Sequence, residues 1–207
     1  MWQIFIGSLI LSIIHATIPN HWIPLIVIGK TEHWSQRETL TATTITGFAH
    51  ALSTVFVGFI VGFIGYKLSK SHELISRVVS PAILVIIGII YLVIDIRKSH
   101  QHIHFDLTRV DRSSKSKWTI VISLSISMFL TPCAEIEAYY FQAGTIGWIG
   151  IMIVSAVYVI TTVIMMLALV YFGIRGIKRF DFHYLEHHEK QVTGIVLILL
   201  GIIAYFS

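Results

Sequence analysis

The sequence predicts an all-α integral membrane protein, and three observations carry that prediction. Hydrophobic residues make up 55% of the 207-residue chain and only 13% of its residues are charged, against about 25% in a soluble domain. Six apolar segments approach or exceed the length of about 20 residues that a membrane-spanning helix needs. The two halves of the chain also resemble each other. We therefore expect a single domain of six transmembrane helices, arranged as two inverted three-helix repeats.

The expected helices follow the apolar segments. In chain order they cover residues 2–29, 40–66, 78–96, 118–141, 146–173 and 192–206. The domain, 1–207, divides into repeat one, 1–96, a histidine-rich loop, 97–117, and repeat two, 118–207. The first segment lacks a basic start and a small-residue cleavage site, so no cleaved signal peptide is expected.

Lysine and arginine fall mostly on one side of the expected helices. The loops after the first, third and fifth helices share one face and hold twelve of these residues, whereas the opposite face holds Lys67, Lys70 and Arg77. Cytoplasmic loops of membrane proteins are enriched in lysine and arginine. We therefore expect a multi-pass protein of the cell membrane, with both termini outside and the 97–117 loop inside. The net charge of +4 arises in these loops, and no nucleic-acid partner is expected.

The two halves of the chain match at an offset of 113 residues. Residues 84–90 correspond to 197–203, and Ile18-Pro19 corresponds to Thr131-Pro132. Residues 52–55 resemble 160–163 at an offset five residues shorter. Chance similarity among isoleucine-rich helices is the alternative, but the three landmarks follow in the same order. Because each half contains an odd number of spans, the second half is expected to be inverted.

Prolines predict breaks in the first and fourth expected helices. Proline lacks an N–H and clashes with the carbonyl four residues earlier. Pro19 therefore frees the carbonyl of His15, Pro24 frees that of residue 20, and Pro132 frees that of Met128. Unpaired backbone groups at membrane depth are tolerated only against protein or a water-filled cavity, so these breaks are expected to line an internal site.

Two histidines and an amide lie close to the first break. His15 is about 20 Å along the first expected helix, near the middle of a bilayer. Ionisable side chains at that depth mark ion or proton pathways by default, and histidine is the commonest metal ligand. His15 and His21 are six residues apart, about 240° around a regular helix, so they share a site with Asn20 between them only if the helix unwinds at Pro19.

The second expected helix carries a polar stripe at three- and four-residue steps. The stripe comprises Thr43, Gly47, His50 and Thr54, with Ser53 alongside. We expect His50 to be a third ligand, with Ser53 and Thr54 donating hydroxyls or supporting the histidines. The alternative for each histidine is a hydrogen-bonding role in helix packing.

The fourth expected helix contributes acidic groups directly after its proline. Glu135 and Glu137 point about 200° apart on a regular helix, so one of them is expected to face the site. Glu135 is preferred, because it follows Pro132 as the residue after His21 follows Pro19, and Glu137 is a supporting group. Cys133 is either a soft ligand or a small buried residue, and we favour the latter. A single cysteine excludes an intrachain disulfide and a CxxC redox pair.

These motifs resemble those of the nickel/cobalt transporter family. The pattern His15-x-x-x-x-Asn20-His21 resembles the family's H-x-x-x-x-D-H motif, with asparagine in place of aspartate. Residues 47–54 resemble the motif on the family's next helix, although His50 stands three residues before Ser53 instead of beside it. The wider similarity is to the superfamily of nickel/cobalt efflux proteins, lysine-exporter-like permeases and thiol-reductant transporters of cytochrome biogenesis. The resemblance implies a permease with proline-interrupted helices and a nickel or cobalt ion as substrate.

Further histidines lie in the loops expected on the cytoplasmic side. They are His100, His102, His104, His183, His187 and His188. Short histidine-rich tracts bind metals weakly and would concentrate ions at a pore mouth, while a solvated polar loop is the plain alternative. Their spacing also resembles two of the three histidine boxes of membrane di-iron hydroxylases and desaturases. That rival reading would make the chain an oxidising enzyme and leaves His15, His21 and His50 unexplained.

The sequence therefore predicts a secondary transporter, not an enzyme, for a divalent transition-metal ion. Nickel or cobalt is the leading choice, zinc and iron remain open because imidazole suits them all, and no organic cofactor is expected. His15, Asn20, His21, His50 and Glu135 are the expected ligands. No Walker A loop is present, so coupling to protons or membrane potential is favoured. Export of a small organic solute is a further alternative, and the direction of transport and any homo-oligomer are left open.

Overall fold

The computed structural model describes residues 1–71, 74–97, 116–176 and 182–206. The described chain is built from helices. In order they are α1 (Trp2–Thr17), α2 (Pro19–Thr31), α3 (Gln36–Ser71), the π-helical turn η1 (Ile75–Val79), α4 (Ser80–Arg97), α5 (Lys117–Phe129), α6 (Ala134–Ile146), α7 (Trp148–Ile174) and α8 (Phe182–Tyr205). The all-α prediction is confirmed.

Four helical stretches are long and apolar enough to cross a membrane. They are Trp2–Thr31, Gln36–Lys70, Ile75–Val93 and Trp148–Ile174, and Lys117–Phe129 and Gln191–Tyr205 are shorter apolar helices. The outer faces of the long helices match this composition. On α3, for example, Leu52 is 59% exposed and Phe56 is 65% exposed, four residues apart on one face. Contiguous exposed apolar surface of this kind suits contact with lipid better than contact with water.

The first and fourth expected helices are both interrupted, as the prolines predict. Ile18 has an extended conformation (φ −60°, ψ 124°) between α1 and α2, and its N–H donates to the His15 carbonyl at 3.1 Å. In the second half, the chain leaves helical geometry after α5 and resumes it at Ala134, with Cys133 extended (φ −92°, ψ 105°). Pro24 differs, because α2 continues through it. Pro24 is the sixth residue of α2, beyond the first four positions whose N–H groups lack a helical partner, so the helix continues with one hydrogen bond missing.

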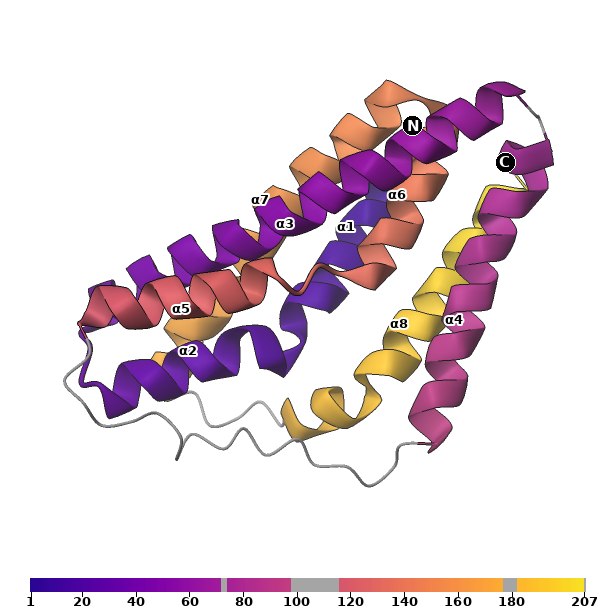
Figure 1. The fold of residues 1–207 in the computed structure, drawn as a ribbon. Coiled ribbons are helices and arrows are strands. Elements are labelled where there is room, and N and C mark those ends of the chain that lie inside the picture. The colour runs from indigo at the N-terminus through magenta and orange to yellow at the C-terminus, as the bar shows by residue number, and fades with distance from the viewer. Residues whose placement is uncertain (72–73, 98–115, 177–181, 207) are drawn as a thin grey trace.

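Each interrupted helix packs against the long helix of the other half. The pair α5 and α6 lies along α3, and the pair α1 and α2 lies along α7, while α3 and α7 also touch (Figure 1). The helices α4 and α8 pack side by side at one flank of the molecule. Both chain termini lie at the same end (Figure 1).

Glycines allow the close approach of α4 and α8. A Cβ atom on Gly88 would lie 2.6 Å from the Gly194 carbonyl oxygen, and one on Gly201 would lie 2.8 Å from the Pro81 carbonyl oxygen. The 113-residue offset relates Gly88 to Gly201 and Pro81 to Gly194. The Gly88–Gly194 contact and the Gly201–Pro81 contact therefore occupy corresponding positions in the two halves of the chain.

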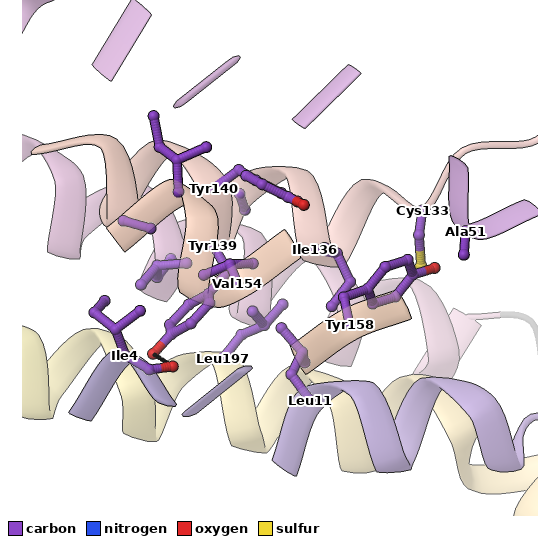
Figure 2. Packing of buried hydrophobic residues seen from close by; sticks show 14 residues of the cluster. Ile4, Leu11, Ala51, Cys133, Ile136, Tyr139, Tyr140, Val154, Tyr158 and Leu197 are labelled. Atoms are coloured by element: carbon purple, nitrogen blue, oxygen red, sulfur yellow. Dashed lines mark hydrogen bonds between the residues drawn. The ribbon is translucent and has the colours of Figure 1, made fainter. Parts of the chain in front are cut away.

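Two groups of buried apolar residues fill the interior. The larger one, which includes Leu11, Ile136, Tyr140 and Tyr158, lies among α1, α3, α6, α7, α4 and α8 (Figure 2). The smaller one contains Trp22, Leu25, Ile26, Met166 and Val170. Between Leu11 of the larger group and Trp22 of the smaller one, the chain carries the buried polar side chains of Ser12 and His15. This polar zone holds the predicted ligands.

Candidate metal centre

Three imidazoles meet at the break between α1 and α2. His15 comes from the last turn of α1, His21 from the first turn of α2 and His50 from the middle of α3. The ring centroids of His15 and His21 are 4.4 Å apart, those of His21 and His50 4.8 Å, and those of His15 and His50 5.5 Å. One nitrogen of each ring lies within 4.8 Å of the others. The extended Ile18 turns the chain and brings His21 back toward His15.

This cluster is sheltered from solvent. His15 is 6% exposed and His50 is 2% exposed. Buried imidazoles are ordinarily held by hydrogen bonds, yet Nδ1 of His21 is buried with no hydrogen-bond partner among the described residues. An unpaired buried nitrogen costs about 1–3 kcal/mol, and a bound cation would supply the missing partner.

A backbone carbonyl determines which nitrogen of His50 faces the cluster. His50 Nδ1 lies 3.1 Å from the Met128 carbonyl oxygen. A carbonyl can only accept, so the Nδ1 atom carries the proton and the Nε2 atom keeps its lone pair. This Nε2 lies 3.2 Å from His15 Nε2 and 3.4 Å from the Tyr158 hydroxyl. Outer hydrogen bonds of this kind orient metal-binding histidines.

The acidic segment at the start of α6 reaches the same place. Cys133 Sγ lies 2.8 Å from His15 Nδ1 and donates to Glu135 Oε2 at 3.0 Å. Donor atoms of His15, Cys133 and Glu135 lie within 4.8 Å of one another. Glu137 lies apart from these groups, and both of its carboxylate oxygens are buried without a hydrogen-bond partner in the described part of the chain.

Ser53 and Thr54 on α3 bind the backbone of the interruption between α5 and α6. Ser53 Oγ donates to the Phe129 carbonyl. Thr54 Oγ1 accepts from the Cys133 N–H and from the Tyr158 hydroxyl, both at 3.4 Å. These hydroxyls therefore position the backbone around Cys133.

Two features of the centre lie beyond the residues that the motifs single out. Tyr158 reaches His50 from α7, and its position in the polar stripe of Ser155, Tyr158 and Thr162 was the available signal. Cys133 is a small buried residue of the larger apolar cluster (Figure 2), and its sulfur also contacts both His15 and Glu135.

Several predicted groups cannot be placed. Asn20 belongs to the first turn of α2, but its side chain lies outside the described part of the structure. The loop histidines His100, His102 and His104 lie outside the described residues. The same holds for the side chains of His183, His187 and His188 on the first turns of α8.

The donor set suits a small transition-metal ion. Tetrahedral zinc takes nitrogen ligands at about 2.0–2.1 Å and thiolate at about 2.3 Å. Such bond lengths place neighbouring donor atoms about 3.3–3.7 Å apart. The His15–His50 nitrogen separation of 3.2 Å and the 3.3 Å between Cys133 Sγ and His15 Nε2 lie close to this spacing, whereas the 2.8 Å between Cys133 Sγ and His15 Nδ1 is shorter. The residues present therefore fit a metal ion with modest adjustment.

Comparison with family models, with curated proteins and with solved structures found no match to this chain. The functional argument therefore rests on the chemistry of the centre.

Proposed function

We propose that this protein is a secondary transporter that moves a divalent transition-metal ion across a cell membrane. The observation that carries the proposal is the convergence of three imidazoles from α1, α2 and α3 at a break in a membrane-length helix, with His15 and His50 buried and His21 half-buried. Ionisable residues at such depth are costly and are retained for transport or proton relay. His15, Asn20, His21, His50 and Glu135 bind the ion, and nickel and cobalt are the first ions to test because of the motif resemblance.

The proposal includes six spans in two inverted repeats. Two lines of packing support this arrangement. Each interrupted helix lies against the long helix of the other half, and the Gly88–Gly194 and Gly201–Pro81 contacts exchange under the repeat offset. Inverted repeats with broken helices at the midplane provide alternating access when one repeat rocks against the other.

The proposed orientation has both termini outside. The last turn of α2 and the first turns of α3 and α5 lie at the end of the molecule opposite the termini (Figure 1). These turns carry Lys30, Arg37 and Lys117. There the Lys117 ammonium pairs with Glu38 at 2.6 Å, joining the starts of α5 and α3. The positive-inside bias makes that end cytoplasmic.

A cavity on the proposed outer side supplies an approach to the centre. It has a volume of about 890 Å³ and is lined by residues of α1, η1, α6 and α8, including Gly7, Arg77 and Tyr139. Leu11 on α1 and Ile136 on α6 lie in sequence between the cavity lining and the ligands, and both are fully buried. We propose that these two side chains separate the cavity from the ligands. Opening a route from the cavity to the ligands requires α1 and α6 to separate.

The experiment that tests this proposal is metal binding by the purified protein. Nickel, cobalt, zinc, iron and manganese are titrated in turn into the wild type and a His15→Ala/His21→Ala variant. Saturable binding that the double variant loses supports the proposal. The matched control is His33→Asn, because His33 is exposed between α2 and α3 and asparagine tolerates its positive φ of 53°.

A second double variant distinguishes the proposed transporter from the alternative, a membrane di-iron enzyme. Binding that survives in His15→Ala/His21→Ala but is lost in His187→Ala/His188→Ala would move the chemistry to the loops and support a di-iron oxidising enzyme. Absence of binding in the wild type would favour an organic solute as substrate.

A further inference from the structure

We infer that Cys133 is a direct ligand in the proposed centre and that the transported ion is therefore a thiophilic, tetrahedrally coordinated cation of the zinc class. This inference rests on the proposed function and narrows its substrate. It replaces the preference for nickel that the motif resemblance alone would suggest.

The first reason is the position of the sulfur. Cys133 is 4% exposed, and its Sγ atom lies 2.8 Å and 3.3 Å from the two ring nitrogens of His15. Its other polar contact is Glu135 Oε2 at 3.0 Å. The sulfur thus lies between an imidazole and a carboxylate, both of which bind metals. Cys133 also packs in the larger apolar cluster, but filling space there would not require a contact with either of these two groups.

The second reason is that the sulfur is positioned relative to the histidines. Cys133 precedes α6 directly, and Thr54 accepts its N–H at 3.4 Å. Ser53, one residue earlier on α3, binds the Phe129 carbonyl at the other end of the same break. His50 lies one turn earlier on α3. One helix therefore holds both a histidine ligand and the backbone that carries the thiol, as a preorganised site requires.

The third reason is independent of the cysteine. His21 Nδ1 is buried and has no hydrogen-bond partner in the described residues, and its ring lies 4.4 Å from that of His15 and 4.8 Å from that of His50. It is an open nitrogen donor facing two further imidazoles. The group of three imidazoles and the group of His15, Cys133 and Glu135 share His15. An ion at the cysteine takes nitrogen, sulfur and oxygen donors from the second group, and its fourth tetrahedral position stays open.

This set discriminates between classes of ion. Zinc is bound by cysteine and histidine in tetrahedral geometry, whereas manganese and magnesium prefer carboxylate, carbonyl and water oxygens in octahedral geometry. Ligation breaks the S–H bond as the metal–sulfur bond forms, and the proton leaves to water, so charge and atoms balance. Zinc and cobalt(II) should therefore bind in preference to manganese.

The test uses cobalt(II) as a spectroscopic probe of the full-length protein in detergent. Because Cys133 is the only cysteine in the chain, a near-ultraviolet thiolate-to-cobalt charge-transfer band must come from it. We expect this band in the wild type and in His33→Asn, and its loss in Cys133→Ser. The zinc-to-manganese affinity ratio of Cys133→Ser should fall by at least about 10-fold, because loss of even an outer partner of a metal ligand lowers affinity by about 10- to 100-fold.

The outcomes separate this inference from the proposed function. Cobalt binding without the charge-transfer band in the wild type would overturn the inference and leave a histidine-based transporter standing. An unchanged zinc-to-manganese ratio in a folded Cys133→Ser variant would also overturn it. No binding of cobalt or zinc by the wild type would overturn both. The wild-type band decides the matter even if Cys133→Ser does not fold.

Discussion

His50 and Met128 are joined by a hydrogen bond of 3.1 Å between an imidazole nitrogen on α3 and a backbone carbonyl at the end of α5. This carbonyl is the one that Pro132 leaves without its helical donor, because proline has no N–H. The helix break in the second half of the chain thus selects the ligand nitrogen of a histidine in the first half. The relationship connects a proline to the chemistry of a site formed by both halves.

Replacing Pro132 by alanine should weaken metal binding. The Met128 carbonyl accepts from the Thr131 N–H at 3.3 Å as well as contacting His50. Alanine supplies an N–H that lets α5 continue, which turns this carbonyl into helical geometry and takes the fixed orientation from His50. We expect metal affinity to fall by about 10- to 100-fold, as on loss of other outer partners of metal ligands. Isothermal titration of zinc or cobalt measures this.

The matched control for this prediction is Pro24→Ala. Pro24 lies inside α2, which continues through it, so its replacement should leave the affinity close to that of the wild type. Equal affinities for all three proteins would show that the Met128 contact does not orient the ligand.

The sequence predicts the helical class, the two breaks and the histidine ligands, because each depends on a local property. Apolar length defines the spans, proline chemistry places the breaks, and charge at membrane depth marks His15, His21 and His50. The contact between Cys133 and His15 could not be predicted in the same way. It depends on how the chain after α5 lies across α3, where Ser53 and Thr54 bind its backbone.

The choice between the two glutamates shows the same limit. Helical spacing predicts that Glu135 and Glu137 face different directions, and the preference for Glu135 rests only on its position three residues after Pro132, as in the repeat. The structure places Glu135 against Cys133 and leaves Glu137 elsewhere. The extended conformation of Cys133 sets the rotation at which α6 begins, and no sequence rule specifies that rotation.

Metal should stabilise the folded wild type but not a His21→Ala variant. A ligand at 100 times its dissociation constant stabilises the state that binds it by about 2.7 kcal/mol. We expect zinc or cobalt to raise the thermal unfolding temperature of the wild type in detergent, with a much smaller rise for His21→Ala. A full shift in His21→Ala would mean that its unpaired nitrogen is not a ligand.

Adding a methyl group at Gly88 should loosen the α4–α8 interface. A Cβ there would lie 2.6 Å from the Gly194 backbone oxygen, and overpacking of this kind costs about 1–3 kcal/mol. Gly201→Ala should behave alike, because its Cβ would lie 2.8 Å from the Pro81 oxygen. Denaturation in mixed detergent micelles measures the change.

Gly47→Ala provides the control for these interface variants. The nearest atom to its Cβ would be the flexible Met166 sulfur at 3.3 Å, which can move aside. If Gly88→Ala and Gly201→Ala unfold at the same denaturant concentration as Gly47→Ala, the close approach of α4 and α8 is contradicted.

Metal affinity should decrease as the pH falls. Protons compete with the ion for imidazole nitrogen and thiolate sulfur, so the metal-bound state loses protons relative to the free state. We expect binding to weaken steadily from about pH 8 to about pH 5, the interval that contains the ordinary histidine pKa of about 6.5. Fluorescence competition with a metal dye at each pH measures it. A flat profile would contradict a site built from histidine and cysteine.

The most direct measurement of the central claim is metal flux through purified protein in sealed vesicles. Zinc, cobalt or nickel is added outside, and a dye trapped inside reports entry. We predict saturable flux for the wild type and His33→Asn, and flux at the level of protein-free vesicles for His15→Ala/His21→Ala. Wild-type flux no greater than that of protein-free vesicles, or equal flux in the double variant, would contradict a metal pathway through the histidine centre.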